Sequence, residues 1–591
     1  MMKVSDFIFD YIVSLGVKHV FYLPGGGAMH LDDSLGHHKD LIPVCMLHEQ
    51  PCAIAAEAYA RISENFGVCV VTSGPGATNT LTGLAGAWLD ATPVIFLSGQ
   101  AKRADLVDGQ GIRQFGIQEV NIVDIVRPVT KYAVQIWDEQ DILYELEKAT
   151  ALAMSGKPGP VWLDIPLDIQ AARVEPSQLR HYEEPQPTFE CKDEEVRETI
   201  ELLNSAQRPM VLLGNGIRLG KAIPEMNMLI EEMNIPVMTT WNGLDLIEDD
   251  NPLFFGRPGA VGHRHSNFIQ QNADFVLTIG TRLNLLSTGY DFDSFLRNAK
   301  HVMVEIDENE MKKRSVHPYL AIHADAKSFL QKMLAFKNKI EHKPREAWWN
   351  YCRGIKDRYP LRIKEQAPEG EGVNTYALVD ALASKLTGDD LFQLTSSGTG
   401  ADISMYGFRV KKGQRAFLTK GLASMGFDLS ACIGSCLAAN QRRTACITGD
   451  GGFMMNVQEL ATLHQLDLPI KLFILCNDGY GMIYNSQAGN FKRLTGCTRE
   501  SGLALPDLKA VVESFKVKCF RIETEAELAN VMDEVLAYRG PAVCLVEVYI
   551  AQKIMPRQTN YMKEDGQMAS RPLEDMSPLL DREEFNQNML S

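Results

Sequence analysis

The chain has 591 residues, 45% of them hydrophobic and 23% charged, and its formal net charge at pH 7 is −16. This length is too great for a single hydrophobic core, so several domains are expected. The negative charge disfavours binding to nucleic acid or anionic membranes, although an acidic surface also simply confers solubility. The first residues lack the apolar run of a signal peptide and no stretch reaches membrane-spanning length, so a soluble cytoplasmic enzyme is expected.

Short apolar runs alternate with helical patterns along almost the whole chain. Nearly continuous apolar strands separated by helices are typical of parallel sheets covered on both faces. The sequence therefore predicts an α/β protein built from doubly wound parallel sheets. The strand candidates are residues 68–72, 93–97, 160–164, 209–213, 275–279, 302–306, 391–394, 444–448, 470–475 and 543–548.

Two charged, proline-containing stretches, residues 172–196 and 338–373, interrupt this alternation and are interpreted as linkers. Residues 551–591 are polar and contain prolines, which favours a surface-packed tail over a mobile lid. The three doubly wound domains are then expected at residues 1–175, 190–337 and 370–550.

Two glycine-rich segments follow neighbouring strand candidates near the C-terminal end: residues 449–453 (GDGGF) and residues 477–481 (NDGYG). A carboxylate and a carboxamide at the ends of adjacent parallel strands can share a hard divalent cation. Glycines beside them let backbone amides approach a diphosphate. The two segments therefore predict a diphosphate-bearing cofactor held through Mg²⁺.

The spacing of these segments resembles that of thiamine diphosphate (ThDP)-dependent enzymes. Over essentially the whole chain, the motifs resemble the acetolactate synthase branch of that family, of the large-subunit type. The resemblance implies that Asp450, Asn477 and the Gly479 carbonyl bind Mg²⁺. For each glycine turn taken alone, a plain strand-to-helix connection is the alternative. The other residues that it assigns to the diphosphate half of the ThDP site are Gly398, Thr399, Gly400, Met425, Gly451, Gly452, Gly481 and Met482.

The first domain is expected to supply an acid, Glu49, which follows the apolar run 43–47 and opens a helical pattern. Such a glutamate is often only a helix-dipole partner. In the resembling family it bonds N1′ of the aminopyrimidine ring and promotes loss of the C2 proton, so its removal is expected to cost about 10²–10⁴ in rate. The resemblance also places Thr72, Gly76 and Asn79 against the cofactor. It places Gly26, Gly27 and Gln118 near the reacting carbon, although Gln118 alone reads as an ordinary surface amide.

Several turns in the middle of the chain resemble the segments that hold FAD in acetolactate synthases. An acidic residue after a strand, here Glu305, can accept from a ribose hydroxyl, and Arg282 can face phosphate. Related enzymes keep this fold empty or bind another nucleotide, so those alternatives stay open. The proposed reaction has no net redox step, so FAD would be structural. The residues that the resemblance assigns to FAD are Gly214, Gly216, Thr240, Asn242, Gly280, Arg282, Asn284, Glu305, Ile306, Asp325 and Ala326.

Three positions depart from acetolactate synthases: Leu167 stands for a lysine, Leu286 for an arginine and Ser486 for a tryptophan. Each lost cation removes a contact worth about 1.5–3 kcal/mol if it faced a carboxylate, and loss of the indole would enlarge the pocket. A larger, uncharged acceptor is therefore one expectation, with a keto-sugar nucleotide as a candidate. The alternative is that neighbouring residues compensate and acetolactate is made.

The resemblance as a whole implies a carboligase that decarboxylates pyruvate and transfers the two-carbon unit to an acceptor carbonyl. It also implies a homodimer or homotetramer with each active site between two subunits. A pyruvate oxidase-like flavoenzyme, and a binding protein that kept the fold without the chemistry, are the alternatives.

Overall fold

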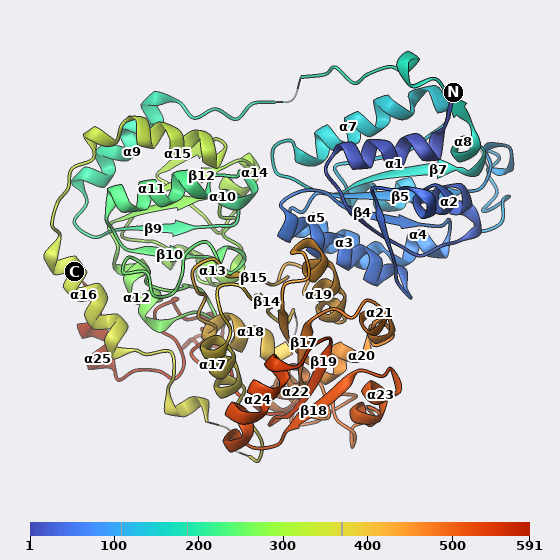
Figure 1. Ribbon diagram of the computed structural model, residues 1–591. Helices are drawn as coiled ribbons and strands as arrows, with labels where there is room; N and C mark the ends of the chain where they lie inside the picture. The colour runs from blue at the N-terminus through green and yellow to red at the C-terminus, as the bar shows by residue number, and fades with distance from the viewer. Residues whose placement is uncertain (108, 186, 368–369, 397, 591) are drawn as a thin grey trace.

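The computed structural model describes residues 1–590 except 108, 186, 368–369 and 397. Figure 1 shows three α/β domains, with the N-terminal domain in blue, the central domain in green and the C-terminal domain in orange and red. Each domain is built on one parallel sheet.

The N-terminal domain has a six-stranded sheet of order β3-β2-β4-β5-β7-β6, in which all pairs are parallel. Its strands are β2 (His19–Tyr22), β3 (Ile42–Cys45), β4 (Gly67–Val71), β5 (Val94–Gln100), β6 (Tyr132–Gln135) and β7 (Val161–Pro166). Its main helices are α1 (Val4–Ser14), α2 (Met29–His37), α3 (Glu49–Ser63), α4 (Pro75–Asn79), α5 (Leu81–Leu89) and α7 (Ile142–Met154).

The central domain has a five-stranded parallel sheet of order β10-β9-β11-β12-β13. Its strands are β9 (Pro209–Leu213), β10 (Val237–Thr239), β11 (Phe275–Ile279), β12 (Lys300–Glu305) and β13 (Leu320–His323). Its helices include α9 (Asp193–Ser205), α10 (Gly216–Leu219), α11 (Ile223–Met233), α12 (Arg264–Asn272), α13 (Leu285–Thr288) and α15 (Ala326–Ala335).

The C-terminal domain repeats the six-stranded arrangement, with the order β15-β14-β16-β17-β19-β18. Its strands are β14 (Leu391–Gln393), β15 (Arg415–Phe417), β16 (Thr444–Gly449), β17 (Ile470–Cys476), β18 (Lys518–Ile522) and β19 (Ala542–Glu547). Its helices include α17 (Thr375–Lys385), α18 (Gly398–Gly407), α19 (Phe427–Ala438), α20 (Asp450–Met454), α21 (Glu459–Gln465), α22 (Gly481–Phe491), α23 (Leu508–Ser514) and α24 (Leu528–Ala537).

The predicted fold class, three α/β domains with parallel sheets, is confirmed. The central strands β4, β9 and β11 are buried along their whole length, as expected for apolar strands covered on both faces. Parallel strands direct their carboxyl ends to one edge of the sheet, so the loops that follow the strands of each sheet gather at that edge.

Helix α3 of the N-terminal domain packs lengthwise on α19 of the C-terminal domain (Figure 1). The two backbones come close where Gly434 faces Ala55, because a Cβ on Gly434 would overlap the Ala55 carbonyl. The residue that starts α3 is therefore positioned by both domains.

The predicted linkers and tail contain regular structure. Within residues 338–373 lies α16 (Glu346–Arg358), which buries Trp348, Trp349, Cys352 and Ile355 on one face. The tail forms a hairpin of β20 (Asn560–Met562) and β21 (Met568–Ser570) and then α25 (Arg582–Gln587), which lies beside α16 in Figure 1. Its described residues, up to 590, pack on the central domain: for example, Asn272 Nδ2 donates to the Asn588 carbonyl at 3.0 Å. The last residue, Ser591, lies outside the described residues.

No helix among the described residues combines the length and the apolar character needed to cross a membrane.

Candidate active site

The two predicted metal-binding segments lie side by side at one edge of the C-terminal sheet. Strands β16 and β17 are parallel neighbours, with Gly449 in register with Leu475. Asp450 directly follows β16, and Asn477 directly follows β17. Strand pairing alone therefore brings the carboxylate and the carboxamide together.

Asp450 is 2% exposed, and its carboxylate accepts hydrogen bonds from the backbone N–H groups of Gly451 (2.7 Å) and Asn477 (3.0 Å). The Asn477 Oδ1 atom accepts from the Gly479 N–H at 3.1 Å. Burial raises the pKa of Asp450 to about 6, and the charge of Asp478 adds to this effect. A divalent cation at this point would compensate the buried negative charge, so the oxygen donors fit Mg²⁺.

Among the described residues, no group of three or more His, Cys, Asp or Glu side chains is arranged to hold a metal ion. The predicted Mg²⁺ ligands form a different kind of site, because Asp450 is the one ligand among them of these residue types. Asn477 and the Gly479 carbonyl would complete it.

Glycines form a cradle around this pair of segments. A Cβ on Gly451 would overlap the Tyr480 ring. A Cβ on Gly481 would lie 3.2 Å from Asn477 Nδ2 and 3.6 Å from Thr399 Oγ1, so the turn after β14 reaches the same place. Gly398 has φ +74° and open space where a Cβ would project, which leaves its backbone accessible to a ligand. A diphosphate fits these backbone groups.

The turn that carries Met425 lies at the same edge of the C-terminal sheet, since Ser396 Oγ, which follows β14, donates to the Ser424 carbonyl at 3.0 Å. Gly452 is buried within α20. Met482 lies in the first turn of α22 and is 38% exposed in the single chain.

The predicted residues of the N-terminal domain also come together. Glu49 is the first residue of α3 and is 9% exposed. Asn79 Nδ2 donates to Glu49 Oε2 at 3.0 Å. A Cβ on Gly76 would lie 3.7 Å from Glu49 Oε1 and 2.7 Å from Thr72 Cγ2, so only glycine leaves this approach open.

The loop after β2 is fixed by side chains. The Gly27 N–H donates to Thr72 Oγ1 at 3.0 Å, and Gln170 Nε2 donates to the Gly27 carbonyl at 2.8 Å. The Gly27 amide is thus engaged in this conformation. Gly26 has open space where a Cβ would project. Of the two glycines expected near the reacting carbon, Gly26 is the better placed to meet a ligand.

Gln118 adopts φ +58° and packs its backbone against Gly74, where a Cβ would lie 2.6 Å from the Gln118 carbonyl. Its loop is fastened by Glu119, whose carboxylate accepts from the N–H groups of Val107 (2.6 Å) and Phe115 (2.9 Å). The structure therefore places Gln118 next to the turn that carries Gly76.

A cavity of about 720 Å³ opens where the central domain meets the N-terminal domain. This volume is within the range of roughly 300–1,000 Å³ for ligand sites. Gly214 packs directly behind the wall, with its N–H donating to the Ile279 carbonyl at 3.0 Å. The other predicted FAD residues all line the cavity: Gly216, Thr240, Asn242, Gly280, Arg282, Asn284, Glu305, Ile306, Asp325 and Ala326.

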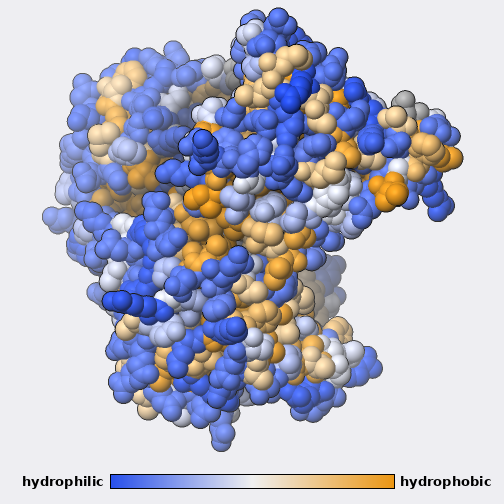
Figure 2. All heavy atoms as spheres, turned by 45° about the vertical axis from the view of Figure 1, so that its right-hand side comes forward, coloured by the Kyte–Doolittle hydropathy of each residue, from blue (hydrophilic) through white to orange (hydrophobic). Residues whose placement is uncertain are grey.

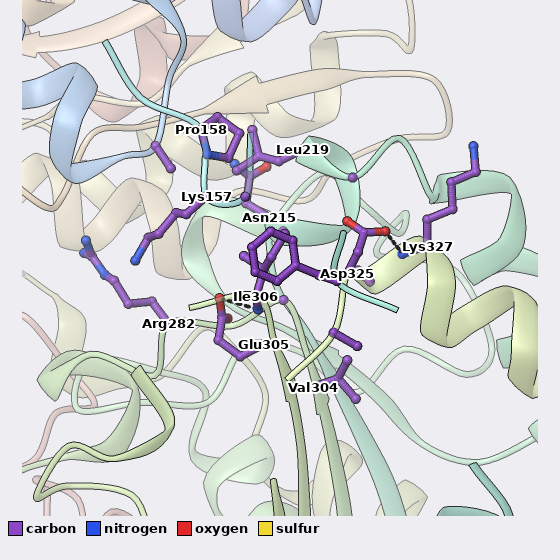
Figure 3. A pocket seen from close by; sticks show the side chains of 18 of the residues that line it. Lys157, Pro158, Asn215, Leu219, Arg282, Val304, Glu305, Ile306, Asp325 and Lys327 are labelled. Carbon is purple, nitrogen blue, oxygen red and sulfur yellow. Dashed lines mark hydrogen bonds between the residues drawn. The ribbon is translucent and has the colours of Figure 1, made fainter. Parts of the chain in front are cut away.

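The cavity offers unused polar groups. Trp241 Nε1 and Asn242 Oδ1 are buried and have no hydrogen-bond partner within the part of the chain that the structure describes. Glu305 accepts from the Ile306 N–H at 3.1 Å, and burial raises its pKa to about 7. Figure 3 shows the side chains of Lys157, Arg282 and Glu305 around the same space. A ligand with hydroxyl and phosphate groups fits this mixture.

Some residues that line the cavity were not predicted from the sequence. Lys157 comes from the N-terminal domain, and its ammonium pairs with Glu310 (2.8 Å) and Asp307 (3.3 Å) across the domain boundary. Phe189 and Glu190 come from the stretch interpreted as a linker. No motif marks these residues, because the fold and not the sequence brings them to the cavity.

Known protein families match this chain in all three of its domains. Residues 2–125 match the N-terminal TPP-binding domain of thiamine pyrophosphate enzymes, residues 196–333 the central domain, and residues 399–546 the C-terminal TPP-binding domain. The chain belongs to the thiamine pyrophosphate enzymes. It is a ThDP-dependent enzyme of the acetolactate synthase type.

Its relatives include the large subunit of acetolactate synthase isozyme 1 from Escherichia coli, 28% identical over 93% of this chain and 95% of the relative. The probable acetolactate synthase large subunit of Methanocaldococcus jannaschii is 32% identical over 91% of each chain. The acetolactate synthase large subunit of Cyanidium caldarium is 30% identical over 92% of this chain and 94% of the relative.

The three positions that were expected to differ from acetolactate synthases lie in different surroundings. Leu167 begins the short helix α8 (Leu167–Ala171). Leu286 is partly buried against two hydrophobic clusters, and its carbonyl accepts from the Ala260 N–H at 2.7 Å. Ser486 is exposed on α22. Leu286 therefore contributes packing where a cation would present charge.

Proposed function

We propose that the protein is a ThDP- and Mg²⁺-dependent carboligase that decarboxylates pyruvate and passes the two-carbon unit to an acceptor carbonyl. The observation that carries the proposal is the buried Asp450 carboxylate beside Asn477, at the edge shared by β16 and β17. Its raised pKa reflects a negative charge that a cation would balance. The names of the relatives support pyruvate chemistry.

When bound, ThDP supplies a carbon nucleophile and an electron sink for decarboxylation of a 2-oxo acid. Asp450, Asn477 and the Gly479 carbonyl would hold the metal ion, while amides of the surrounding glycines bind the diphosphate. Glu49 would hold the proton at the ring nitrogen, and Asn79 keeps the Glu49 carboxylate in place through its 3.0 Å hydrogen bond. The Gly26 amide and Gln118 would meet the substrate oxygen.

We further propose that two chains form each site, one supplying the Glu49 half and the other the Asp450 half. Large apolar side chains are exposed on both halves of the single chain, among them Leu47 (52%) and Met29 (51%) on one and Met482 (38%) and Ile483 (45%) on the other. Figure 2 shows apolar side chains gathered in the middle of the face that it presents. Exposed apolar groups of this extent favour burial against a second subunit. Such a homodimer could pair further into a tetramer.

We assign the 720 Å³ cavity to FAD in a structural role. Support comes from the predicted residues that line it and from the unpartnered Trp241 and Asn242 atoms. An oxidase that uses a redox-active flavin is the alternative, and oxygen uptake with pyruvate and phosphate would reveal it.

For the acceptor, the relatives favour a second pyruvate and therefore acetolactate as product. They give no support to a keto-sugar nucleotide. The Leu167, Leu286 and Ser486 positions still favour a larger, uncharged carbonyl as a second candidate, because two cations and an indole are missing.

The test is product analysis by mass spectrometry with ThDP, Mg²⁺ and labelled pyruvate alone. Abundant acetolactate supports the first candidate, while consumption of pyruvate only in the presence of an added ketone or aldehyde supports the second. The Glu49→Gln variant is the control, and pyruvate consumption is expected to fall by about 10²–10⁴. Equal consumption by the variant would contradict the assigned role of Glu49.

A further inference from the structure

The start of α3 is held by a buried carboxylate from the other end of the chain. Glu459, the first residue of α21 in the C-terminal domain, is 0% exposed. Its Oε1 atom accepts from the Leu47 N–H at 3.0 Å, across 412 residues of sequence. Its Oε2 atom accepts from Thr462 Oγ1 at 2.7 Å. Leu47 stands two residues before Glu49.

A carboxylate at a helix start usually serves its own helix, where it stabilises the first turn. Glu459 differs, because one of its carboxylate oxygens accepts a hydrogen bond from the backbone of the N-terminal domain. The other oxygen accepts from Thr462. Burying a charged group is unfavourable unless it is well hydrogen-bonded. The buried Glu459 carboxylate is therefore offset by hydrogen bonds, one of which fixes the segment before Glu49.

Two of the contacts from the C-terminal domain bear directly on the position of α3. Gly434 of α19 admits the α3 backbone at Ala55, and Glu459 fastens the chain just before the helix begins. The first contact fixes the distance between the helices. The second fixes the start of α3, where the Glu49 side chain emerges.

We infer that Glu459 is a positioning residue for Glu49, acting from the C-terminal domain of the same chain through the Leu47 amide. The inference rests on the proposed function, in which Glu49 meets the aminopyrimidine ring of ThDP. A misplacement of about 1 Å can cost about 100-fold in rate. Loss of the Glu459 acceptor leaves the Leu47 N–H without its partner and frees the Glu49 turn to shift.

The experiment measures two quantities on the full-length holoenzyme: the Kd for ThDP by calorimetry with saturating Mg²⁺, and the rate at which the C2 proton of bound ThDP exchanges with deuterium. For Glu459→Ala, the expected Kd is unchanged and the exchange is about 10- to 100-fold slower. Glu459→Gln keeps an oxygen acceptor and should lie within about threefold of the wild-type rate. Thr462→Val removes only the hydrogen bond that supports the carboxylate, so its C2-exchange rate should lie between those of Glu459→Ala and Glu459→Gln.

Asp249→Ala is the matched control. The Asp249 carboxylate also crosses a domain boundary to accept a backbone amide, from the Val410 N–H at 2.8 Å. It belongs to the contact between the central and C-terminal domains, so its change should lower the melting temperature without slowing C2 exchange. A purely structural role for Glu459 would make the two variants behave alike, and this result would overturn the inference.

A third measurement needs no cofactor. Hydrogen–deuterium exchange of the protein alone should become faster at residues 46–52 in Glu459→Ala and not in Asp249→Ala. If Glu459→Ala does not fold, Glu459→Asp takes its place, since it keeps the charge and shortens the reach by one methylene. Wild-type exchange rates at both C2 and residues 46–52 in the variant would overturn the inference. Failure of the wild-type protein to bind ThDP would instead refute the proposed function, while exchange at residues 46–52 would still test the link.

Discussion

The side-chain amide of Asn79 donates a hydrogen bond to the carboxylate of Glu49, with 3.0 Å between Nδ2 and Oε2. Glu49 begins α3 and Asn79 ends α4, so the bond ties together the helices that follow β3 and β4, the two strands that flank β2 in the sheet. It fixes the direction of the carboxylate that the proposed mechanism uses.

Replacing Asn79 with alanine is therefore expected to slow C2-proton exchange of bound ThDP by about 10- to 100-fold, since a hydrogen bond to a charged group contributes about 1.5–3 kcal/mol. Thr78→Ala is the neighbouring control and should leave the rate unchanged, because the hydrogen bond of Thr78 Oγ1 is a local one, to the Pro75 carbonyl. Equal rates in the Asn79 variant and the wild type would remove Asn79 from the mechanism.

Binding of FAD to the central cavity is expected to depend on Arg282. Arg282→Met should weaken FAD binding by about 10- to 100-fold, the value of one charge-assisted hydrogen bond. Fluorescence titration of FAD measures this directly. Saturating FAD at about 100 times its Kd should also stabilise the wild-type fold by about 2.7 kcal/mol.

Lys337→Met is the control for that titration, since Lys337 is an exposed cation of the same domain that pairs with Glu232 at 3.7 Å and lies away from the cavity. The same loss of FAD affinity in both variants would show a general charge effect and would contradict the assignment of Arg282.

The free energy of unfolding should decrease as the pH falls, because His301 is buried in its neutral form. Burial lowers the pKa of His301 to about 3, and its Nε2 atom lies 3.0 Å from Thr278 Oγ1. In the unfolded chain the pKa is about 6.5, so between pH 6.5 and 3 the unfolded state binds the extra proton and is favoured. By this effect the fold loses about 2 kcal/mol at pH 5 relative to pH 7.

The His301→Gln variant cannot take up that proton. Its free energy of unfolding, measured by urea denaturation, should decline less between pH 7 and pH 5 than that of the wild type. A constant difference between the two proteins over this range would show that His301 does not titrate on unfolding.

Much of the C-terminal half of the site could be predicted from sequence, because strand pairing determines it. Apolar runs located β16 and β17 to within a residue or two, and Asp450 and Asn477 each directly follow one of them. Parallel pairing then leaves little freedom in where the two side chains meet. In the N-terminal domain, the resemblance to ThDP-dependent enzymes, and not strand pairing, assigned Glu49 and Thr72 to the site.

Contacts between distant segments could not be predicted in this way. Lys157 reaches the central cavity because the N-terminal domain docks beside it, and Glu459 meets Leu47 because α3 packs on α19. Neither contact leaves a local pattern in the chain. Helix α16 did leave one, since Trp348, Cys352 and Ile355 recur at helical spacing, but the charged residues around them favoured a linker.

The central claim is tested most directly by calorimetric titration of ThDP into the wild-type protein and into the Asp450→Ala variant, each with and without Mg²⁺. The account predicts saturable, Mg²⁺-dependent binding of one ThDP per chain to the wild type. It predicts a loss of at least about 100-fold in affinity for the variant, because the buried carboxylate that would hold the metal ion is gone. Wild-type affinity in the Asp450→Ala variant, or binding that does not depend on Mg²⁺, would contradict it.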